Sequence, residues 1–340
     1  MSTSPKPVCT VCIANYNGIG LIDACIDSVL AQDCGFEVEI VVHDDASSDG
    51  SAAHIKERYP QVVLIDSAEN VGFCVANNRM AKAARGEYLL LLNNDAELFL
   101  DALRTLCRAA TDIGEPAILG LPQYDAASGK LIDIGSSLDI FLNPMPDAEP
   151  APATGVIIGA CMWLPRSLWM ELGGFPDWFG SLAEDTYLCC VARLQGHPVR
   201  VLPNSGFRHW VGASLGGGKV TADRRLTTSI KRRALSERNK NYVMTLTYPA
   251  PLFQLIFPLH VFLLLLEGGI LSLAKRDARL WKDVYWRSLS TLLRERKRLC
   301  TLRASVQATR RIPRFRFFDG FAVVPHKLRL LFRHGLPDIH

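Results

Sequence analysis

The hydrophobic residues of this 340-residue chain form short runs that alternate with amphipathic stretches. The most marked run is Leu89–Leu92, four leucines in a row, which is typical of a short strand buried on both faces at the centre of a parallel sheet. The predicted strands of this half are Val8–Ala14, Glu37–Val42, Val62–Ile65 and Tyr88–Leu92, and the predicted helices are Leu21–Gln32, Ser51–Tyr59 and Asn70–Ala84. The alternation predicts βαβ units, a parallel sheet and the α/β class.

The length and the later pattern predict one large domain with an appendage. Residues 117–202 contain shorter apolar runs, typical of mixed strands, at Ala117–Leu121, Lys130–Ile134, Val156–Leu164 and Val199–Leu202. After residue 245 the chain becomes hydrophobic and basic. We therefore expect a domain over residues 1–245 and a helical region over residues 246–340.

Polar side chains follow three of the predicted strands at the point where each strand ends. Asn15 and Asn17 follow the first strand, Asp44 and Asp45 the second, and Asn93–Asp95 the leucine strand. The carboxyl ends of parallel strands lie at one edge of a sheet, where α/β proteins bind ligands such as nucleotides. The glycine signatures of dinucleotide-binding turns and of P-loops are absent from the sequence, which argues against dehydrogenases and P-loop enzymes.

Asp95 has two interpretations, and the residues alone leave both open. A carboxylate delivered by a rigid strand to the edge of the sheet suits a hard divalent cation such as Mg²⁺ or Mn²⁺, which can bridge to phosphates. Alternatively, Asn93–Asp95 is a turn in which Asp95 caps a helix that begins after Leu98.

A second polar group follows a glycine- and aromatic-rich loop, Gly173–Gly180. Ser181 and Glu184 have the spacing of a capping box for a helix that runs to about Leu194, which gives Glu184 a structural explanation. Asp185 lies one residue beyond that box, so capping does not explain it and it is a candidate for a catalytic role. We expect the dipole at the helix N-terminus to keep the pKa of Asp185 low, and the glycine loop to close over a bound molecule.

Charge divides the chain into two unequal parts. Residues 1–210 carry 13 Lys and Arg against 26 Asp and Glu, a net charge of −13, whereas residues 211–340 carry 25 against 8, a net charge of +17. A basic tail suggests contact with anions, either phospholipid or phosphate. Cys9 and Cys12 have the spacing of half a metal or redox motif, but they lie in an apolar run and no second pair follows. We expect buried free thiols, a reducing cytosolic compartment and no signal peptide, since the first seven residues contain no apolar segment.

Six motifs occur together in the order and approximate spacing of one enzyme family. They are Val11–Asn17, Asp44–Ser51, Asn70–Phe73, Asn93–Asp95, Gly173–Phe175 with Glu184–Asp185, and His209. Over about residues 8–245 this set resembles the family 2 glycosyltransferases, most of all the bacterial rhamnosyltransferase-type members. The resemblance implies a GT-A fold, which is a nucleotide-binding, mostly parallel central sheet flanked by helices. It also implies inverting transfer from a nucleotide-diphosphate sugar to a hydroxyl group.

The resemblance also assigns roles to particular residues. Asp185 would be the general base, and Asp95 with His209 would hold Mg²⁺ or Mn²⁺. Asp95 is the last residue of the family's D-x-D motif, which reads Asn93-Asn94-Asp95 here, so one carboxylate remains for the metal. The residues expected to contact the donor nucleotide are Asn15, Asn17, Asp45, Asn70, Gly72 and Asn94, with Asp45 on the pyrimidine base. The acceptor loop would include Gly174, Trp178 and Glu184. The leaving diphosphate would be assisted by Arg224, Arg225, Arg232 or Arg233.

The function implied is a metal-dependent, inverting glycosyltransferase that adds one sugar at a time, since the Q-x-x-R-W motif of processive members is absent. It would move a sugar, rhamnose among the candidates, from a dTDP- or UDP-sugar to a glycan or a lipid-linked acceptor during synthesis of a bacterial cell-surface polysaccharide. Two alternatives stay open: a sugar-phosphate nucleotidylyltransferase and a non-catalytic membrane-bound scaffold on a transferase fold. We expect no nucleic-acid partner, and the sequence leaves homo-oligomerisation open.

The region after residue 245 predicts attachment to a membrane. Leu252–Ala274 is 23 residues long, and about 20 apolar residues suffice to span a bilayer. The flank from Lys275 to Arg333 carries 17 Lys and Arg against 4 Asp and Glu, and such basic flanks stay on the cytoplasmic side of the inner membrane. Nucleotide sugars are on that side as well, so both flanks of the apolar segment are expected at the cytoplasmic face. We therefore favour a re-entrant or interfacial arrangement, while a helical appendage packed on the first domain or on a second copy stays open. The residues expected on a membrane-surface helix are Trp281, Val284, Tyr285, Leu289, Leu292, Leu293 and Leu299.

Overall fold

The computed structural model describes residues 6–146, 154–210, 217–220 and 226–339. The chain separates into two compact units: residues 1–136, 146–192 and 197–210 form the first, and residues 137–145, 193–196 and 211–340 form the second. The predicted boundary at residue 245 falls inside helix α7 (Ile230–Thr247), which packs against other helices of the second unit. The division therefore lies near residue 210, with two short segments of the earlier chain counted in the second unit.

The first unit is an α/β unit with two sheets. Its elements are β1 (Cys9–Asn15), α1 (Ile22–Leu30), β2 (Val38–Asp44), α2 (Ser51–Arg58), β3 (Val63–Asp66), α3 (Phe73–Ala83), β4 (Tyr88–Asn93), β5 (Ala96–Leu98), α4 (Ala102–Ile113), β6 (Ile118–Gly120), β7 (Gln123–Asp125), β8 (Leu131–Asp133), β11 (Cys161–Pro165), α5 (Arg166–Leu172), the 3₁₀ turn η1 (Asp177–Phe179), α6 (Glu184–Leu194), β12 (Val199–Val201) and β13 (Phe207–His209).

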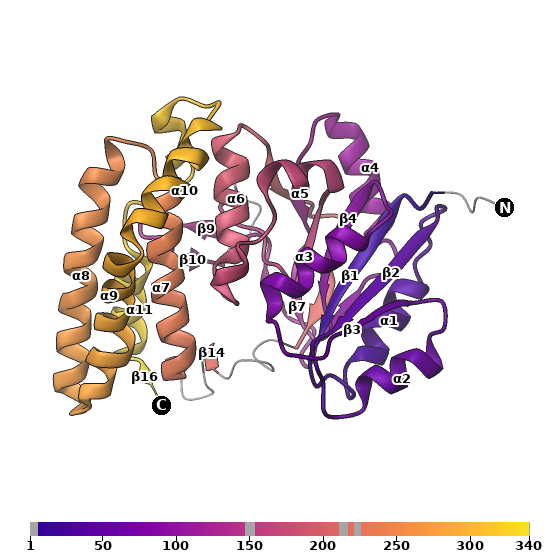
Figure 1. Cartoon of the computed structure of the whole chain (residues 1–340), viewed down its shortest axis with the longest axis horizontal. Coiled ribbons are helices and arrows are strands. Elements are labelled where there is room, and N and C mark those ends of the chain that lie inside the picture. Colours follow the sequence, from indigo (N-terminus) through magenta and orange to yellow (C-terminus); the bar gives the residue numbers. More distant parts are fainter. Residues whose placement is uncertain (1–5, 147–153, 211–216, 221–225, 340) are drawn as a thin grey trace. The chain divides into compact units, whose positions relative to one another are not determined.

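The leucine strand lies at the centre of the main sheet, as predicted. The seven strands follow the order β12-β6-β11-β4-β1-β2-β3, and every pair is parallel except those that β11 makes with β4 and β6. Leu89–Leu92 are almost completely buried. Residues of α1, α2 and α4 form one core with β1, β2 and β4, while Figure 1 shows α3 and α5 over the face of the sheet turned to the viewer. The predicted βαβ half is therefore confirmed.

A smaller four-stranded sheet continues from the end of the leucine strand. Its order is β5-β13-β7-β8, and β13 pairs antiparallel with β5 and parallel with β7. Since β5 follows β4 after only two residues, β13 and its last residue, His209, lie close to the polar end of β4. This pairing brings a residue more than a hundred positions away to Asp95.

The prediction that Cys9 and Cys12 are buried free thiols is confirmed. Both are completely buried in β1, all ten cysteines are free, and Cys9 belongs to the core shared with α1. Burial raises the pKa of both thiols well above the usual range. The residues stand three apart in a strand, so their side chains point to opposite faces of the sheet and cannot bind one metal ion.

The second unit is mostly helical. Its elements are β9 (Ser137–Leu138), β10 (Pro144–Met145), β14 (Gly217–Val220), β15 (Leu226–Thr228), α7 (Ile230–Thr247), α8 (Leu252–Lys275), the π-helical segment η2 (Leu280–Trp286), α9 (Arg287–Arg294), α10 (Arg296–Ala308), the 3₁₀ turn η3 (Arg314–Phe318), α11 (His326–His334) and β16 (Asp338–Ile339). These helices are drawn from orange to yellow in Figure 1.

The expected membrane-surface helix over residues 281–299 is wrong for its central residues. Val284 and Tyr285 are completely buried, and with Leu289 they form a core with leucines of α8. The apolar periodicity of this segment therefore faces the interior of the second unit. Apolar side chains are exposed instead on α8, namely Leu255, Leu259, Phe262, Leu263, Leu266, Ile270 and Leu273.

Candidate active site

The loops that follow β1, β2 and β4 are joined by hydrogen bonds between buried polar side chains. The Asn15 amide donates to the Asp44 carboxylate at 2.8 Å and to the Ser51 hydroxyl at 3.0 Å. The Asn94 amide donates to Asn15 Oδ1 at 2.8 Å. Asn15 and Asp44 are almost completely buried, so these bonds satisfy polar groups that the fold removes from water. Asp44 is a site residue that the motif comparison did not single out.

Asn17 ties the first of these loops to the second. Its backbone N–H donates to the Ser47 hydroxyl at 2.9 Å, and its side-chain oxygen accepts from the Ser48 N–H at 2.8 Å. Asn17 and Ala46 both have positive φ angles, 50° and 61°, which non-glycine residues adopt at some energetic cost. The surrounding hydrogen bonds therefore hold a strained backbone at the carboxyl ends of β1 and β2.

Asp45 holds the loop that precedes α3. Its two carboxylate oxygens accept from the backbone N–H groups of Val71 at 2.7 Å and Gly72 at 2.9 Å. Gly72 has a φ angle of 86°, which explains the glycine at this position. The structure thus brings Asn70 and Gly72 beside Asp45, as the resemblance implied, and leaves the Asn70 side chain exposed.

Asp95 is not a helix cap. Asn94 and Asp95 do form a turn, but the next element is strand β5 (Ala96–Leu98) and α4 begins only at Ala102, so the predicted helix cap is wrong. The carboxylate is buried, and its Oδ1 lies 3.0 Å from His209 Nε2. The pairing of β5 with β13 creates this approach.

The Asp95–His209 pair has the properties of two metal ligands. Asp95 Oδ1 is buried and has no hydrogen-bond partner, although an imidazole nitrogen is close by. The other ring nitrogen, Nδ1, lies 2.9 Å from Nε2 of the Gln123 amide on β7. Turning that amide by 180° presents its oxygen to an Nδ1–H group and leaves His209 Nε2 as an acceptor, which is the tautomer that binds a metal. Carboxylate oxygen with imidazole nitrogen suits Mn²⁺, and no described cluster offers a third His, Cys, Asp or Glu ligand.

Asp185 lies at the first turn of α6 and is partly buried. Its Oδ1 accepts from the Thr186 N–H at 2.5 Å and from the Thr186 hydroxyl at 3.1 Å, and its Oδ2 accepts from the Gly159 N–H at 3.4 Å. Burial raises the pKa of Asp185 above its usual value, and the hydrogen bonds only partly oppose this effect. The expectation of a low pKa, based on the helix dipole, is therefore wrong because the loss of water outweighs the dipole.

Helix α6 starts later than the predicted capping box places it. Helix α6 begins at Glu184 itself, and the two residues before it, Leu182 and Ala183, have positive φ angles of 71° and 63°. Ser181 therefore lies outside the helix, and Glu184 is a buried first-turn residue. Two successive non-glycine residues in the left-handed region are costly, and such strain is concentrated at functional sites.

The loop Gly173–Gly180 is anchored to α3 by hydrogen bonds. The Asn78 side chain on α3 accepts from the Phe175 N–H at 3.1 Å and donates to the Phe175 carbonyl at 2.7 Å and to Asp177 at 2.6 Å. Gly174 has a φ angle of 64°, and a Cβ atom there would lie 2.5 Å from Asn78 Oδ1. Phe175 and Phe179 are buried, while Trp178 is half-buried against Phe179.

Two backbone contacts join the predicted groups of site residues. The Cys74 N–H donates to the Gly180 carbonyl at 3.1 Å, so the donor loop before α3 meets the acceptor loop. The Asn93 N–H donates to the Ala160 carbonyl at 3.1 Å, next to the Gly159 that contacts Asp185. The adjacent residues Gly159 and Ala160 therefore connect the start of α6 with the end of β4.

The proposed arginine helpers do not belong to this set of contacts. Arg224 and Arg225 lie outside the described residues. Arg232 and Arg233 are on α7 in the second unit, where Arg233 pairs with Glu237 and Glu267.

Comparison with known proteins agrees with this geometry. Residues 10–173 match the sequence profile of glycosyl transferase family 2. The chain is 37% identical over 136 residues to the succinoglycan biosynthesis protein ExoO of Rhizobium meliloti (strain 1021), covering 40% of this chain and 37% of that protein. The match spans little more than a third of the length of each of two curated relatives.

Solved structures share the fold at low sequence identity. S. aureus TarS superposes with a TM-score of 0.57 at 17% identity, covering 92% of this chain and 54% of TarS. A mannosyltransferase from Pyrobaculum calidifontis, PcManGT, superposes with a TM-score of 0.52 at 19% identity, covering 90% of this chain and 86% of that one. Likeness at this identity is informative about the fold alone. Residues 10–173 therefore match glycosyl transferase family 2, and the first unit has the GT-A fold.

Proposed function

We propose that this protein is an inverting glycosyltransferase that moves one sugar from a nucleotide-diphosphate sugar to an acceptor hydroxyl group. The observation that carries the proposal is that the buried Asp95–His209 pair and the Asp185 carboxylate come to the same end of β4. An acceptor hydroxyl is a weak nucleophile, and the leaving diphosphate is an anion. The two groups supply the two functions that this transfer needs, a base and a site for a cation.

The donor is expected to lie over the loops after β1, β2, β3 and β4. These loops offer backbone groups and the side chains of Asn15, Asn17, Asn70 and Asn94, and Asp45 fixes the turn at Gly72. Both oxygens of Asp45 still have unused lone pairs, so the carboxylate can also accept from a pyrimidine N–H group. Structures with this fold were solved with UDP (TarS) and with GDP-mannose and Mn²⁺ (PcManGT), which supports a nucleotide-sugar donor and a divalent cation.

Asp95 and His209 are the residues that would hold such a cation. A bound Mg²⁺ or Mn²⁺ would neutralise charge on the diphosphate, with the remaining ligands taken from phosphate oxygens and water. Gln123 fixes the orientation of the His209 ring, and the Asp95 carboxylate lies 3.0 Å from the other ring nitrogen.

Asp185 is proposed as the general base. Its raised pKa makes it a stronger base than an ordinary aspartate, provided that the carboxyl is ionised at the working pH. Thr186 fixes one carboxylate oxygen through two hydrogen bonds, while the contact from Gly159 to the other oxygen is long and weak. That second oxygen is therefore the one placed to take a proton from an acceptor hydroxyl. The anchored loop with Gly174 and Trp178, and Glu184 beside Asp185, would contact the acceptor.

The acceptor is proposed to be a glycan or a lipid-linked glycan of a bacterial cell-surface polysaccharide. The similarity to a succinoglycan biosynthesis protein, and a 35% identity over 99 residues to the poly(ribitol-phosphate) beta-glucosyltransferase of Bacillus spizizenii, support this class. Rhamnose stays a candidate sugar, with dTDP-rhamnose as the donor to test first.

Attachment of the second unit to the cytoplasmic face of the membrane is part of the proposal. Among the described residues, α8 is the one helix whose length and composition would let it cross a membrane, and 22% of its most apolar window is buried. Its exposed leucines and phenylalanines, with the basic residues of α9, α10 and α11 nearby in the sequence, favour an interfacial position.

A panel of nucleotide sugars tests the enzyme class. Purified protein is incubated with Mn²⁺ and each nucleotide sugar, with and without acceptor lipids extracted from the source cells, and released nucleoside diphosphate is measured. Acceptor-dependent release with one donor is expected. Formation of a nucleotide sugar from a nucleoside triphosphate and a sugar phosphate would establish the nucleotidylyltransferase alternative, and inactivity with every donor and extract would favour the scaffold.

Vesicle flotation tests membrane attachment with a matched pair of variants. Leu255 on α8 and Leu100 in the first unit are equally exposed, at 67% each. Leu255→Glu is expected to reduce flotation with anionic vesicles, whereas Leu100→Glu should float like the wild type. Equal flotation of both variants would contradict the role of α8.

A further inference from the structure

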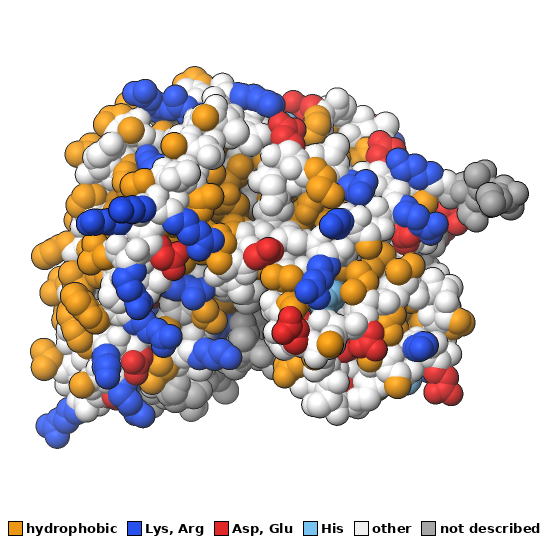
Figure 2. Space-filling model, in the orientation of Figure 1, with side chains coloured by type: hydrophobic (Ala, Val, Ile, Leu, Met, Phe, Trp, Pro, Cys, Tyr) orange, Lys and Arg blue, Asp and Glu red, His pale blue; other side chains and the backbone are white. Residues whose placement is uncertain are grey.

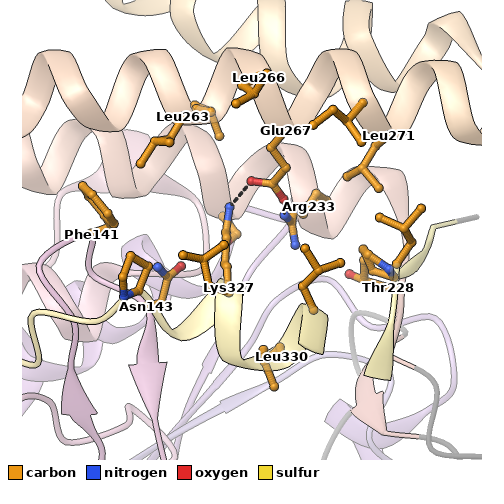
Figure 3. A pocket seen from close by; sticks show the side chains of 18 of the residues that line it. Phe141, Asn143, Thr228, Arg233, Leu263, Leu266, Glu267, Leu271, Lys327 and Leu330 are labelled. Carbon is orange, nitrogen blue, oxygen red and sulfur yellow. Dashed lines mark hydrogen bonds and ion pairs between the residues drawn. The ribbon is translucent and has the colours of Figure 1, made fainter. Parts of the chain in front are cut away.

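The second unit contains a cavity of about 430 Å³, a size common among small-molecule sites in proteins. All of its lining residues belong to the second unit. Figure 3 shows Leu263, Leu266 and Leu271 of α8 along one wall, and Leu330 of α11 on the opposite side. Nine of the 22 lining residues are leucine or isoleucine, and Phe141, Pro325 and Pro337 add further apolar surface, so the cavity suits an apolar group.

The cavity is continuous with exposed apolar surface. Leu266 and Ile270 on α8 line the cavity and are 49% and 50% exposed, and Leu328 and Leu331 on α11 do the same at 48% and 41%. In Figure 2, hydrophobic side chains gather over the part of the molecule that α8 occupies, with Lys and Arg among them. An apolar chain can therefore enter from this face without passing a polar barrier.

A cluster of charged side chains closes one side of the cavity. Lys327 donates to Glu267 at 2.7 Å, as the dashed line in Figure 3 marks, and to Glu237 at 2.8 Å. Arg233 pairs with Glu267 and lies 3.2 Å from Glu237. Lys240 lies 3.0 Å from Glu237 and donates to Asn143 at 2.9 Å. These groups are mostly buried within the unit.

The cluster has more positive than negative charge. Three cations, Arg233, Lys240 and Lys327, face two carboxylates, Glu237 and Glu267, which leaves one positive charge in excess. The ammonium group of Lys327 has three hydrogens, and the two carboxylates account for two of them. Because an excess charge is unfavourable away from water, an anion beside Lys327 would stabilise this arrangement.

We propose that this cavity binds an anionic lipid, with an apolar chain between α8 and α11 and a phosphate group at Lys327 and Arg233. The aliphatic walls argue against a sugar or a nucleotide, and the charged side argues against a neutral hydrocarbon. The proposal does not depend on sugar transfer, since lipid binding requires neither the donor nor the cation of the first unit. It assigns the second unit a specific lipid site in addition to a membrane surface.

Binding is measured by calorimetry and native mass spectrometry on the full chain, with dodecyl phosphate as the probe below its micelle concentration. One molecule is expected to bind per chain. Dodecanol should bind about tenfold more weakly, because the interaction with a charged phosphate contributes about 1.5–3 kcal/mol, and inorganic phosphate should not bind measurably. Equal affinity for dodecyl phosphate and dodecanol would overturn the assignment of the head-group site.

Two variants and a matched control locate the site. Ile270→Trp fills the cavity and should abolish binding of dodecyl phosphate, whereas Leu273→Trp, on the same helix but outside the cavity and 81% exposed, should bind like the wild type. Lys327→Gln should remove the preference for phosphate over alcohol. If Lys327→Gln fails to fold, the Ile270→Trp comparison still decides. Undiminished binding to Ile270→Trp would overturn the proposal.

Lipid extracted from the purified wild type distinguishes the source of the ligand. Phospholipid would identify a bilayer lipid, and a polyprenyl phosphate would identify an acceptor-type lipid; either result supports the shared chemistry. A chain that dimerises in gel filtration, becomes monomeric as Ile270→Trp and does not bind dodecyl phosphate would show that a second copy covers the cavity. That outcome would overturn the proposal.

Discussion

The two units hold the carboxylates of their polar clusters differently. In the first unit, Asp45 accepts from two backbone N–H groups and Asp185 from the Thr186 N–H, so dipoles rather than cations hold these carboxylates. In the second unit, Glu237 and Glu267 are surrounded by the cations of Arg233, Lys240 and Lys327. Backbone dipoles fix a carboxylate without cancelling its charge, whereas side-chain cations cancel it.

This difference distinguishes carboxylates that can act on a ligand from carboxylates that stabilise the fold. An ionised carboxylate held by N–H groups, as at Asp45 and Asp185, is still able to bind a cation or take a proton. Burial alone would raise the pKa of Glu237, but the cations Lys240, Lys327 and Arg233 more than compensate and hold it well below its usual range. Glu237 therefore stays ionised and contributes to folding, and the excess charge of its cluster is positive.

The largest expected effect is on the cation site. Asp95→Ala removes the one buried carboxylate that faces His209, so cation-dependent transfer should fall by about 10³-fold or more, because a metal supplies several kcal/mol to the transition state. Turnover is measured against Mn²⁺ concentration, with thermal unfolding as the control for folding. A variant with wild-type turnover in both EDTA and Mn²⁺ would exclude Asp95 as a metal ligand.

The next effect concerns the proposed base. Asp185→Asn keeps the shape of the side chain and removes its basicity, so kcat should fall about 10²–10⁴-fold while donor affinity is retained. Donor binding by calorimetry and turnover by product release are measured on one preparation. Turnover within about threefold of wild type would move the role to another residue, with Glu184 the first candidate.

The charge cluster of the second unit should respond through stability. Glu237→Gln leaves Arg233, Lys240 and Lys327 without one of their two counter-charges, and breaking such a buried arrangement costs about 3–5 kcal/mol. Urea unfolding of wild type and variant measures the difference. A loss below about 1 kcal/mol would show that the cluster is solvated and that the comparison between the units does not hold.

Asp45→Asn should have a smaller, mixed effect. The asparagine places an NH₂ group toward one of the two backbone donors, Val71 or Gly72, and leaves that N–H unsatisfied, at a cost of about 1–3 kcal/mol. We expect reduced stability together with a higher KM for the donor. Ser48→Ala, which changes an exposed neighbour in the same loop, is the matched control. A change in KM with unaltered stability would mean that Asp45 acts only on the ligand.

The smallest effect is the pH dependence of Asp185. Its pKa in the folded chain is raised above the unfolded value, so the wild type loses stability as the pH rises from the unfolded pKa through the folded one. Asp185→Asn has no titrating group at this position and does not show this loss of stability, so the Tm of the variant minus the Tm of the wild type should increase from pH 4 to pH 7. In the same range kcat/KM of the wild type should fall toward acid pH as the base becomes protonated. A constant difference in Tm across the range would contradict the raised pKa.

Local patterns in the sequence were sufficient to predict the first half of the fold. Four consecutive leucines, alternating strands and helices, and polar residues at each strand end identify a mostly parallel sheet with Asn15, Asp45 and Asp95 at one edge. These features follow from burial and from backbone geometry within about thirty residues of chain, where hydrophobic periodicity is a direct physical signal.

Long-range pairing decided what the sequence could not. The contact between His209 and Asp95 depends on the pairing of β13 with β5, and the anchored loop depends on Asn78, which is 97 residues from Phe175. The pKa of Asp185 depends on how much water the fold removes around it, which no local motif encodes. The sequence correctly predicted an apolar helix face over residues 281–299, but we assigned that face to the membrane, whereas it packs in the core of the second unit. Periodicity shows that a helix face is buried, and only tertiary packing shows which partner it is buried against.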